Sequence, residues 1–319
     1  MATAIQARTI DEALREPPPG GPAGWLRHAW NFCRRKPLGG LGALIIVLML
    51  FAALFVDGSL IGVDGPLLAP QHYDDQTFGA ENLDPSADHL LGTDQFGRDI
   101  FSRILYGARI SVIIGLGVVL IAGVFSLAIG TISGYFSGWA DTIIQRVVDV
   151  FLAIPPLILL IYGLSVFAGT AGPYTRMFWI ITIVGIVLTA SSIRVIRSAA
   201  IATANNPYVD AARTLGATDA RIVFRHIVPN VIPVVIVLSS VQLGTAILAE
   251  AAISFLGLGI PEPFPSWGTM LSINGSSQFR AYPMQAVWPG LAVAIAVWGF
   301  NMFGDALRDV LDPRLRGSR

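Results

Sequence analysis

Long apolar stretches with almost no charge constrain this chain more than any other feature of its sequence. In lipid, backbone polar groups must bond to one another, so an apolar stretch of about 18 to 25 residues crosses a bilayer as an α-helix. Hydrophobic residues make up 54% of the chain and charged residues only 13%, which excludes an ordinary soluble domain. The sequence therefore predicts an all-α polytopic membrane protein with six transmembrane helices, near residues 38–56, 110–134, 147–168, 177–193, 231–253 and 284–303.

Pro155 and Pro156 interrupt the third of these spans. Proline lacks a backbone donor and its ring clashes with the preceding turn. We therefore expect a kink there.

Basic residues are distributed unevenly along the chain. Loops rich in Lys and Arg stay on the cytoplasmic side of a membrane. With the N-terminus inside, only five of the 21 basic residues face outward, namely Arg98, Arg103, Arg109, Arg176 and Arg280. We therefore expect both termini in the cytoplasm.

This orientation divides the chain into segments. The N-terminal part comprises a mobile cytoplasmic tail at 1–24, an interfacial helix on membrane lipid at 25–37 and the first transmembrane helix at 38–56. The remainder comprises an outer segment at 57–109, a five-helix core at 110–305 and a cytoplasmic tail at 306–319. Within the core, the prolines of an outer loop at 257–283 predict that it holds no regular helix.

The loop at 206–229 lies between the fourth and fifth spans and is polar. Asn206 suits a helix cap, Pro207 a first helical turn and Gly216 a left-handed stop, so the pattern predicts two short helices joined at the glycine. One face of the first helix then carries Tyr208, Ala211, Ala212 and Leu215. Two interpretations are open: this face docks on something outside the bilayer, or it packs against the protein's own bundle.

Two groups of charged residues need an explanation. Glu250 lies near the interior of the fifth span, where a charge is costly, so it is either a pathway or gate residue or a side chain that snorkels or hydrogen-bonds to a neighbouring helix near the outer surface. Arg98, Asp99 and Arg103 precede the second span and either contact an external protein or, with Arg109, pair among themselves on a short outer helix. Arg146 and Asp149 have the spacing of a structural ion pair.

The sequence carries no sign of catalysis. It has no Gly-x-x-x-x-Gly-Lys-Ser/Thr phosphate loop, no His-Glu-x-x-His and no Gly-x-Ser-x-Gly. Cys33 is the only cysteine and the four histidines are scattered, so we expect no catalytic residues, no metal site and no cofactor in this chain. Nothing points to a nucleic-acid partner.

Several blocks of sequence resemble a known transporter family. Asp210-Ala211-Ala212, then Gly216 and His226-Ile227-Val228-Pro229, is similar to the cytoplasmic coupling loop of binding-protein-dependent ATP-binding-cassette importers. Asp210 stands where Glu is usual, and His226 where an aliphatic residue is usual. Blocks within 91–111, 254–268 and 304–314 resemble the C-type subunit of the oligopeptide, dipeptide and nickel permease family, so the resemblance covers nearly the whole chain.

The resemblance implies a type I importer permease fold with a cytoplasmic coupling helix, in a bacterial cytoplasmic membrane. The implied partners are a B-type permease subunit, two ATPase subunits that bind ATP and Mg, and an extracytoplasmic solute-binding protein. The implied cargo is peptide, with nickel or another small solute as the alternative within the family and an ATP-independent carrier or channel as the alternative outside it. The residues implied in ATPase coupling are Tyr208, Asp210, Ala211, Ala212, Arg213, Leu215 and Gly216.

Overall fold

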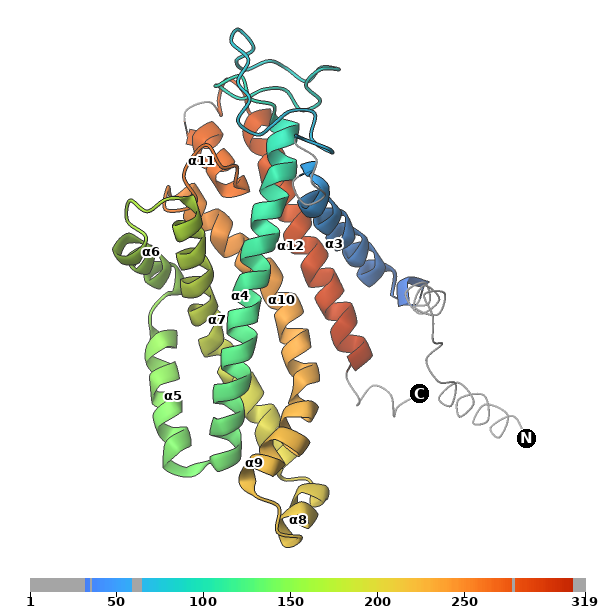
Figure 1. The fold of residues 1–319 in the computed structure, drawn as a ribbon, viewed down its shortest axis with the longest axis vertical. Coiled ribbons are helices and arrows are strands. Elements are labelled where there is room, and N and C mark those ends of the chain that lie inside the picture. Colours follow the sequence, from blue (N-terminus) through green and yellow to red (C-terminus); the bar gives the residue numbers. More distant parts are fainter. Residues whose placement is uncertain (1–31, 35, 59–64, 277–278, 312–319) are drawn as a thin grey trace, which may run out of the picture.

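In a computed structural model of the chain, long helices stand side by side and one end carries most of the loops (Figure 1). The structure describes residues 32–34, 36–58, 65–276 and 279–311, and within these ranges it contains no β-strand longer than an isolated bridge. The helices are α3 (Pro37–Phe55), α4 (Ile100–Phe136), α5 (Gly138–Ala153), α6 (Pro156–Phe167), α7 (Pro173–Ala204), α8 (Pro207–Thr214), α9 (Asp219–Ile222), the π-helix η2 (Val223–Ile227), α10 (Val228–Phe255), α11 (Trp267–Ser276) and α12 (Met284–Leu311).

Five helices of the described residues are long and apolar enough to cross a membrane, and a bent pair raises the number to six. The five are α3, α4, α7, the continuous run from α9 through η2 to α10, and α12. The bent pair is α5 and α6, whose axes differ by 88°. The all-α membrane fold is therefore as predicted, and the third span in chain order, made of α5 and α6, is broken.

The break between α5 and α6 is sharper than the predicted kink. Ile154 and Pro155 both have extended ψ angles, 129° and 128°, so the chain turns a corner between two separate helices. A residue before proline avoids the helical region, which accounts for Ile154. Beyond the corner, α6 packs against α7, where the rings of Phe167 and Trp179 stack at 4.9 Å.

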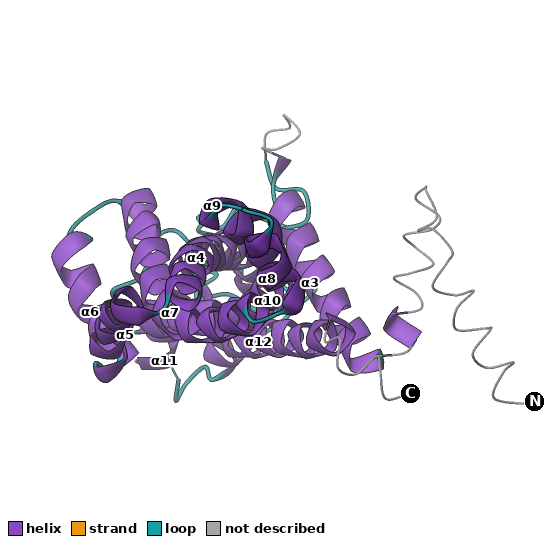
Figure 2. Ribbon diagram, turned by 90° about the horizontal axis from the view of Figure 1, so that it is seen from below, coloured by secondary structure: helices purple, strands orange, loops and turns teal. Residues whose placement is uncertain are grey.

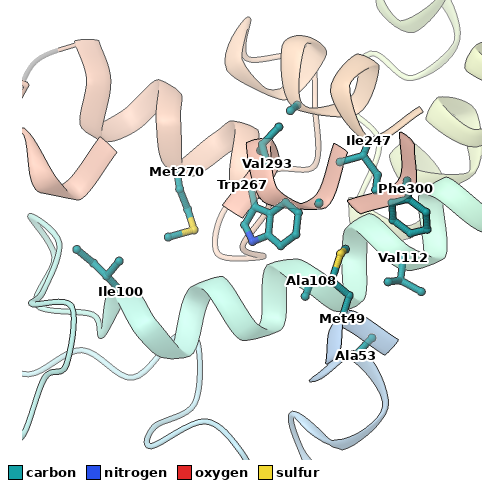
Figure 3. Packing of buried hydrophobic residues seen from close by; sticks show 12 residues of the cluster. Met49, Ala53, Ile100, Ala108, Val112, Ile247, Trp267, Met270, Val293 and Phe300 are labelled. Carbon is teal, nitrogen blue, oxygen red and sulfur yellow. The ribbon is translucent and has the colours of Figure 1, made fainter. Parts of the chain in front are cut away.

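Three apolar clusters hold the bundle together. The first joins α3, α4, α10, α11 and α12, and Figure 3 shows Trp267, Ile247 and Phe300 converging from three of these helices. The second joins α4, α6, α7 and α10. The third joins α7, α8, α9, η2 and α10 at the far end of the bundle. Seen from that end, α5 and α6 lie on one flank of the bundle and α3 on the other (Figure 2).

Several predicted boundaries change, and α4 begins at Ile100, inside the predicted outer segment at 57–109. The outer loop 257–283 does contain a regular helix, α11, because its prolines leave residues 266–282 free between Pro265 and Pro283. The last helix continues past residue 305 to Leu311, and Asp309 near its end pairs with Lys36 before α3 at 2.6 Å. The predicted tail at 1–24, most of the predicted interfacial helix at 25–37 and residues 312–319 lie outside the described residues.

Candidate functional site

The helix α8 forms the tip of the bundle opposite the outer loops (Figure 1). Pro207 occupies its first turn, as predicted, and Asn206 has the extended backbone of an N-cap. The Asn206 side chain does not cap α8, which corrects that part of the prediction. Its amide nitrogen instead donates to the carbonyls of Ala202 and Thr203, which closes the end of α7.

Gly216 ends this segment in the left-handed conformation, as predicted, with φ +80°. The amide of Gly216 donates to the Arg213 carbonyl at 2.9 Å, and the amide of Ala217 donates to the Ala212 carbonyl at 3.0 Å. Nothing lies within 4 Å of the position where a Cβ would stand. The glycine is therefore required by backbone geometry alone.

A single buried side chain, Val209, fastens α8 to the bundle. It packs in one cluster with Ala204 of α7, Ile222 of α9 and Ile227 of η2. Our reading of the loop missed this anchor, because one valine between polar residues gives no periodic signal. One signal in the sequence could have identified the anchor, because Val209 is the only large aliphatic residue among positions 206–214.

The predicted docking face points away from the bundle. Leu215 is 88% exposed and Tyr208 44% exposed, and Ala211 is also exposed, while Ala212 is partly covered. The interpretation that this face packs on the protein's own helices is therefore wrong for Leu215, whereas the Tyr208 ring lies 6.1 Å from the His226 ring of η2. An exposed apolar face on a short helix has the character of an interaction surface.

Polar contacts fix the orientation of α8 relative to its neighbours. Asp210 pairs with Arg213 one turn later at 3.2 Å, and both are exposed. The Arg213 guanidinium lies 5.5 Å from the centre of the Tyr135 ring at the end of α4, and the Tyr135 hydroxyl donates to Asp219 of α9 at 2.6 Å. The tip thus connects α4, α8 and α9.

The π-helix η2 separates α9 from α10. The amide of Val228 donates to the Val223 carbonyl, five residues back, so η2 holds one residue more than an α-turn. Pro229 follows directly and lacks the donor that an α-helix needs, which favours the wider turn. The side-chain amide of Asn230 donates to the His226 carbonyl at 2.7 Å.

Two ion pairs join α5 to α7 along the half of the bundle that leads to α8. Arg197 donates to both oxygens of Asp141 at 2.6 Å. Asp149 pairs with Arg194 at 2.5 Å and only loosely, at 3.7 Å, with the predicted partner Arg146. The predicted pair of Arg146 and Asp149 therefore exists, but the shorter contact of Asp149 is the one to Arg194 on α7.

At the opposite end, buried charges join the outer segment to the loop before α11. Arg98 lies between Asp94 at 2.7 Å and Glu262 at 2.6 Å. Arg103 donates to the same Glu262 at 3.1 Å and to the Tyr73 carbonyl at 3.0 Å. Glu262, about 160 residues along the chain, was not identified from the sequence.

Asp99 has a different task. One carboxylate oxygen accepts from the amide and hydroxyl of Ser102, both at 2.7 Å, and so caps α4, while the other lies 3.1 Å from His89 Nδ1. Arg98, Asp99 and Arg103 are all almost completely buried. The prediction that they contact an external protein is therefore wrong, and so is the detail that they pair among themselves, because their partners are Asp94, Glu262, His89 and Ser102.

Glu250 is completely buried in α10, and one of its oxygens accepts from the Ser254 hydroxyl at 2.6 Å. The backbone of Gly268 lies so close that a Cβ there would stand 2.3 Å from the Ala251 carbonyl, so α11 seals this side of α10. Glu250 therefore neither snorkels nor lines an open surface. The predicted pathway contact is corrected, and so is the alternative of a hydrogen bond to a neighbouring helix, because the partner Ser254 lies on the same helix.

The described residues include no group of three or more His, Cys, Asp or Glu side chains placed to hold a metal ion. This arrangement is suited to movement of helices and to contact with other molecules. One end presents an exposed short helix, and the other presents loops fastened by buried ion pairs.

Comparison of the sequence with known proteins identifies a matching family. Residues 126–317 match the family described as "Binding-protein-dependent transport system inner membrane component", and residues 24–85 match the "N-terminal TM domain of oligopeptide transport permease C". The chain is 38% identical over 292 residues to the dipeptide transport system permease protein DppC of Alkalihalophilus pseudofirmus. The aligned region covers 91% of this chain and 90% of that protein.

Two further relatives are similar over comparable lengths. The oligopeptide transport system permease protein OppC of Bacillus subtilis is 38% identical over 285 residues, 89% of this chain and 88% of its own length. The glutathione transport system permease protein GsiD of Pectobacterium atrosepticum is 36% identical over 306 residues, 96% of this chain and 94% of its own.

Proposed function

This chain belongs to the family of binding-protein-dependent transport system inner membrane components, and from that premise we propose that it is the C-type permease subunit of an ATP-driven importer of short peptides. It forms the translocation pathway together with a B-type permease subunit. Two ATPase subunits bind ATP and Mg on the cytoplasmic side, and a solute-binding protein delivers peptide on the outer side. The peptide-transport names of the similar proteins support this cargo.

The observation that carries the proposal is the construction of α8. It presents exposed Tyr208, Ala211 and Leu215 beyond the end of the bundle while Val209 alone fastens it inside. A face of this kind is unnecessary for a helix that only connects two spans, since an apolar side chain such as Leu215 is unfavourable in water. It suits contact with a separate protein.

The same geometry supports a coupling mechanism. The third apolar cluster packs α8 together with α7, α9 and α10, and packed elements move as rigid bodies rather than deforming. Displacement of α8 by an ATPase subunit then tilts α7 and the α9–α10 helix together. In this account Tyr208, Ala211, Ala212 and Leu215 form the contact, Asp210 and Arg213 hold its orientation, and Gly216 sets the turn.

Orientation follows from the same proposal. The α8 end carries Arg213, Arg221 and Arg225, and the nearby ends of α3 and α12 carry Lys36 and Arg308. This arrangement agrees with the tendency of basic residues to stay inside. We place α8 and both termini in the cytoplasm of a bacterial cell, and the 57–99 segment outside the cytoplasmic membrane.

A substitution of Leu215 tests the proposal directly. In the complete transporter, Leu215→Glu is expected to reduce co-purification of the ATPase subunits and peptide-stimulated ATP hydrolysis about tenfold or more, because it puts a charge into an apolar contact. The fold should be unaffected, since Leu215 is 88% exposed.

Leu90→Glu serves as the matched control, because Leu90 is also exposed but lies at the opposite end of the bundle. It should leave ATPase association unchanged. Normal association and coupled hydrolysis in the Leu215 variant would refute the coupling role.

A further inference from the structure

A cavity of about 420 Å³ opens at the outer end of the bundle. Its walls come from four parts of the chain: the outer segment, the first turns of α4, the start of α7 and the loop before α11. This volume lies in the range of small-molecule sites. Of the charged residues singled out before the second span, only Arg109 lines it.

Aromatic rings form one wall of the cavity. Tyr73 lies at the centre, with ring centroids 4.2 Å from His72, 5.0 Å from Tyr106 and 5.6 Å from Phe264. Tyr174 extends the wall, 5.8 Å from Phe264, and is 72% exposed at the cavity mouth. Such a wall favours apolar or cationic groups, because aromatic ring faces carry negative charge.

An ion pair provides the charged part of the lining. Arg109 donates to both oxygens of Asp57, at 2.8 and 2.9 Å, and to the Ala53 carbonyl at 2.7 Å. Both side chains keep part of their surface exposed. The guanidinium is thus already committed to a carboxylate, and 20% of the Asp57 side chain stays exposed.

The surroundings of the cavity favour a cation over an anion. Asp74 and Asp75 are exposed beside the aromatic wall. Burial and the neighbouring Asp74 raise the pKa of the Tyr73 phenol above its usual value, so its hydroxyl stays protonated. The neighbouring Arg176 is not among the lining residues, and its guanidinium donates to the carbonyls of Gly169 and Gly259.

One polar atom of the lining is unused. Tyr106 is almost completely buried and its hydroxyl has no hydrogen-bond partner among the described residues. A buried hydroxyl without a partner carries a desolvation cost that a bound polar group would remove. This second observation points to a ligand that brings its own hydrogen-bonding group into the cavity.

We propose that this cavity is a peptide subsite at the outer mouth of the permease, where the α-ammonium group of a short peptide binds near Asp57 and an adjacent apolar side chain lies against Tyr73, Tyr174 and Phe264. The inference rests on the proposed function and extends it by assigning a place and a chemical preference to the cargo. Selectivity then resides partly in this subunit.

Photo-cross-linking tests the subsite. The probe is the dipeptide of alanine and p-benzoylphenylalanine, applied to the complete membrane complex in phosphatidylglycerol nanodiscs. Its benzophenone, lying against the aromatic wall, should label Met177, which lines the cavity. An excess of Ala-Phe should compete, and N-acetylation of the probe should reduce labelling about fivefold by removing the ammonium group.

Matched tyrosine variants provide the control. Tyr174→Ala should reduce labelling about fivefold, whereas Tyr162→Ala, at a site on α6 that is also exposed, should not change it. Neither side chain is buried, so both variants should fold. Equal labelling of the two variants would overturn the subsite.

Three further outcomes separate the subsite from the proposed function. Import of Ala-Phe by the wild-type complex without competed labelling overturns the subsite alone. Absence of both import and labelling overturns the proposed function and the subsite with it. Labelling that disappears when phosphatidylethanolamine is added assigns the cavity to a lipid headgroup ammonium and overturns the subsite.

Discussion

Glu262 holds two buried guanidinium groups at once, although it lies far along the chain from both of them. Arg98 and Arg103 are 3% and 1% exposed, and each donates to this one carboxylate. Removing one partner of a buried ion pair leaves an uncompensated charge, which costs more than the pair contributed. Exposed pairs such as Asp210 with Arg213 contribute little by comparison.

We therefore expect Glu262→Ala to lower the free energy of unfolding by on the order of 3 kcal/mol, since it leaves two buried charges short of a partner. Thermal unfolding of the purified subunit in detergent measures the effect. The control is Asp210→Ala, which should cost less than about 1 kcal/mol. Equal melting temperatures for the two variants would contradict the stabilising role assigned to the ion pairs of Glu262.

At this scale, sequence reasoning located residues with local signatures. The turn at Gly216 and the shared helix face of Tyr208 and Leu215 follow from spacing within one short loop, whereas the exposure of that face did not. It missed Val209 and Glu262, because burial and ion pairing over about 160 residues depend on tertiary contacts that no local pattern records. For the same reason it left open whether Arg98, Asp99 and Arg103 contact an external protein or pair among themselves, when they are interior and have other partners.

At the scale of elements, glycines serve two different purposes. Gly216 stands in the left-handed conformation with open space around it, so only its backbone matters. Gly268 opens the contact between α11 and α10, where a Cβ would stand 2.3 Å from the Ala251 carbonyl. The first glycine shapes a turn, and the second lets two helices touch.

These roles predict unequal effects of the same substitution. Gly216→Ala should cost about 1 to 2 kcal/mol of stability through backbone strain alone, and the subunit should still insert and fold. Gly268→Ala should cost about 3 kcal/mol or more, because backbone atoms must move apart. Yield and melting temperature after purification measure both, and a milder effect at Gly268 than at Gly216 would count against this packing.

The bend between α5 and α6 marks the limit of element prediction. Two adjacent prolines predict an interruption, and it occurs where expected. Its size depends on where α6 finds its partners, and Leu160 and Leu164 find them on α7, in one cluster with Ile180 and Val184. A single sequence does not specify that contact, so the angle of 88° between α5 and α6 could not be predicted from it.

At the scale of the whole molecule, the helices are longer than a bilayer is thick. α4 has 37 residues and α7 has 32, lengths of about 55 and 48 Å at 1.5 Å per residue. The hydrocarbon layer is about 30 Å thick. The ion pairs of α7 with Asp141 and Asp149 lie on the α8 half, so the excess length of α7 extends toward α8 as a charged stem.

Cysteine labelling tests the orientation that follows. In a Cys33→Ser background, which removes the only cysteine, Phe78→Cys should react with an impermeant maleimide in intact spheroplasts, because Phe78 is 94% exposed in the outer segment. Leu215→Cys should react only after the membrane is permeabilised. The reverse pattern would overturn the placement of α8 in the cytoplasm.

The extra residue in η2 sets the rotational phase of everything that follows it. Each residue of an α-helix advances the chain by about 100°, since a turn takes 3.6 residues. Deleting one residue from 223–227 would turn α10 about its axis by that amount relative to α8. Glu250 would then leave its sealed position under α11 and emerge on another side of the helix. This short widened turn is thus the point that sets the rotation of Glu250 under α11 relative to the tip at α8.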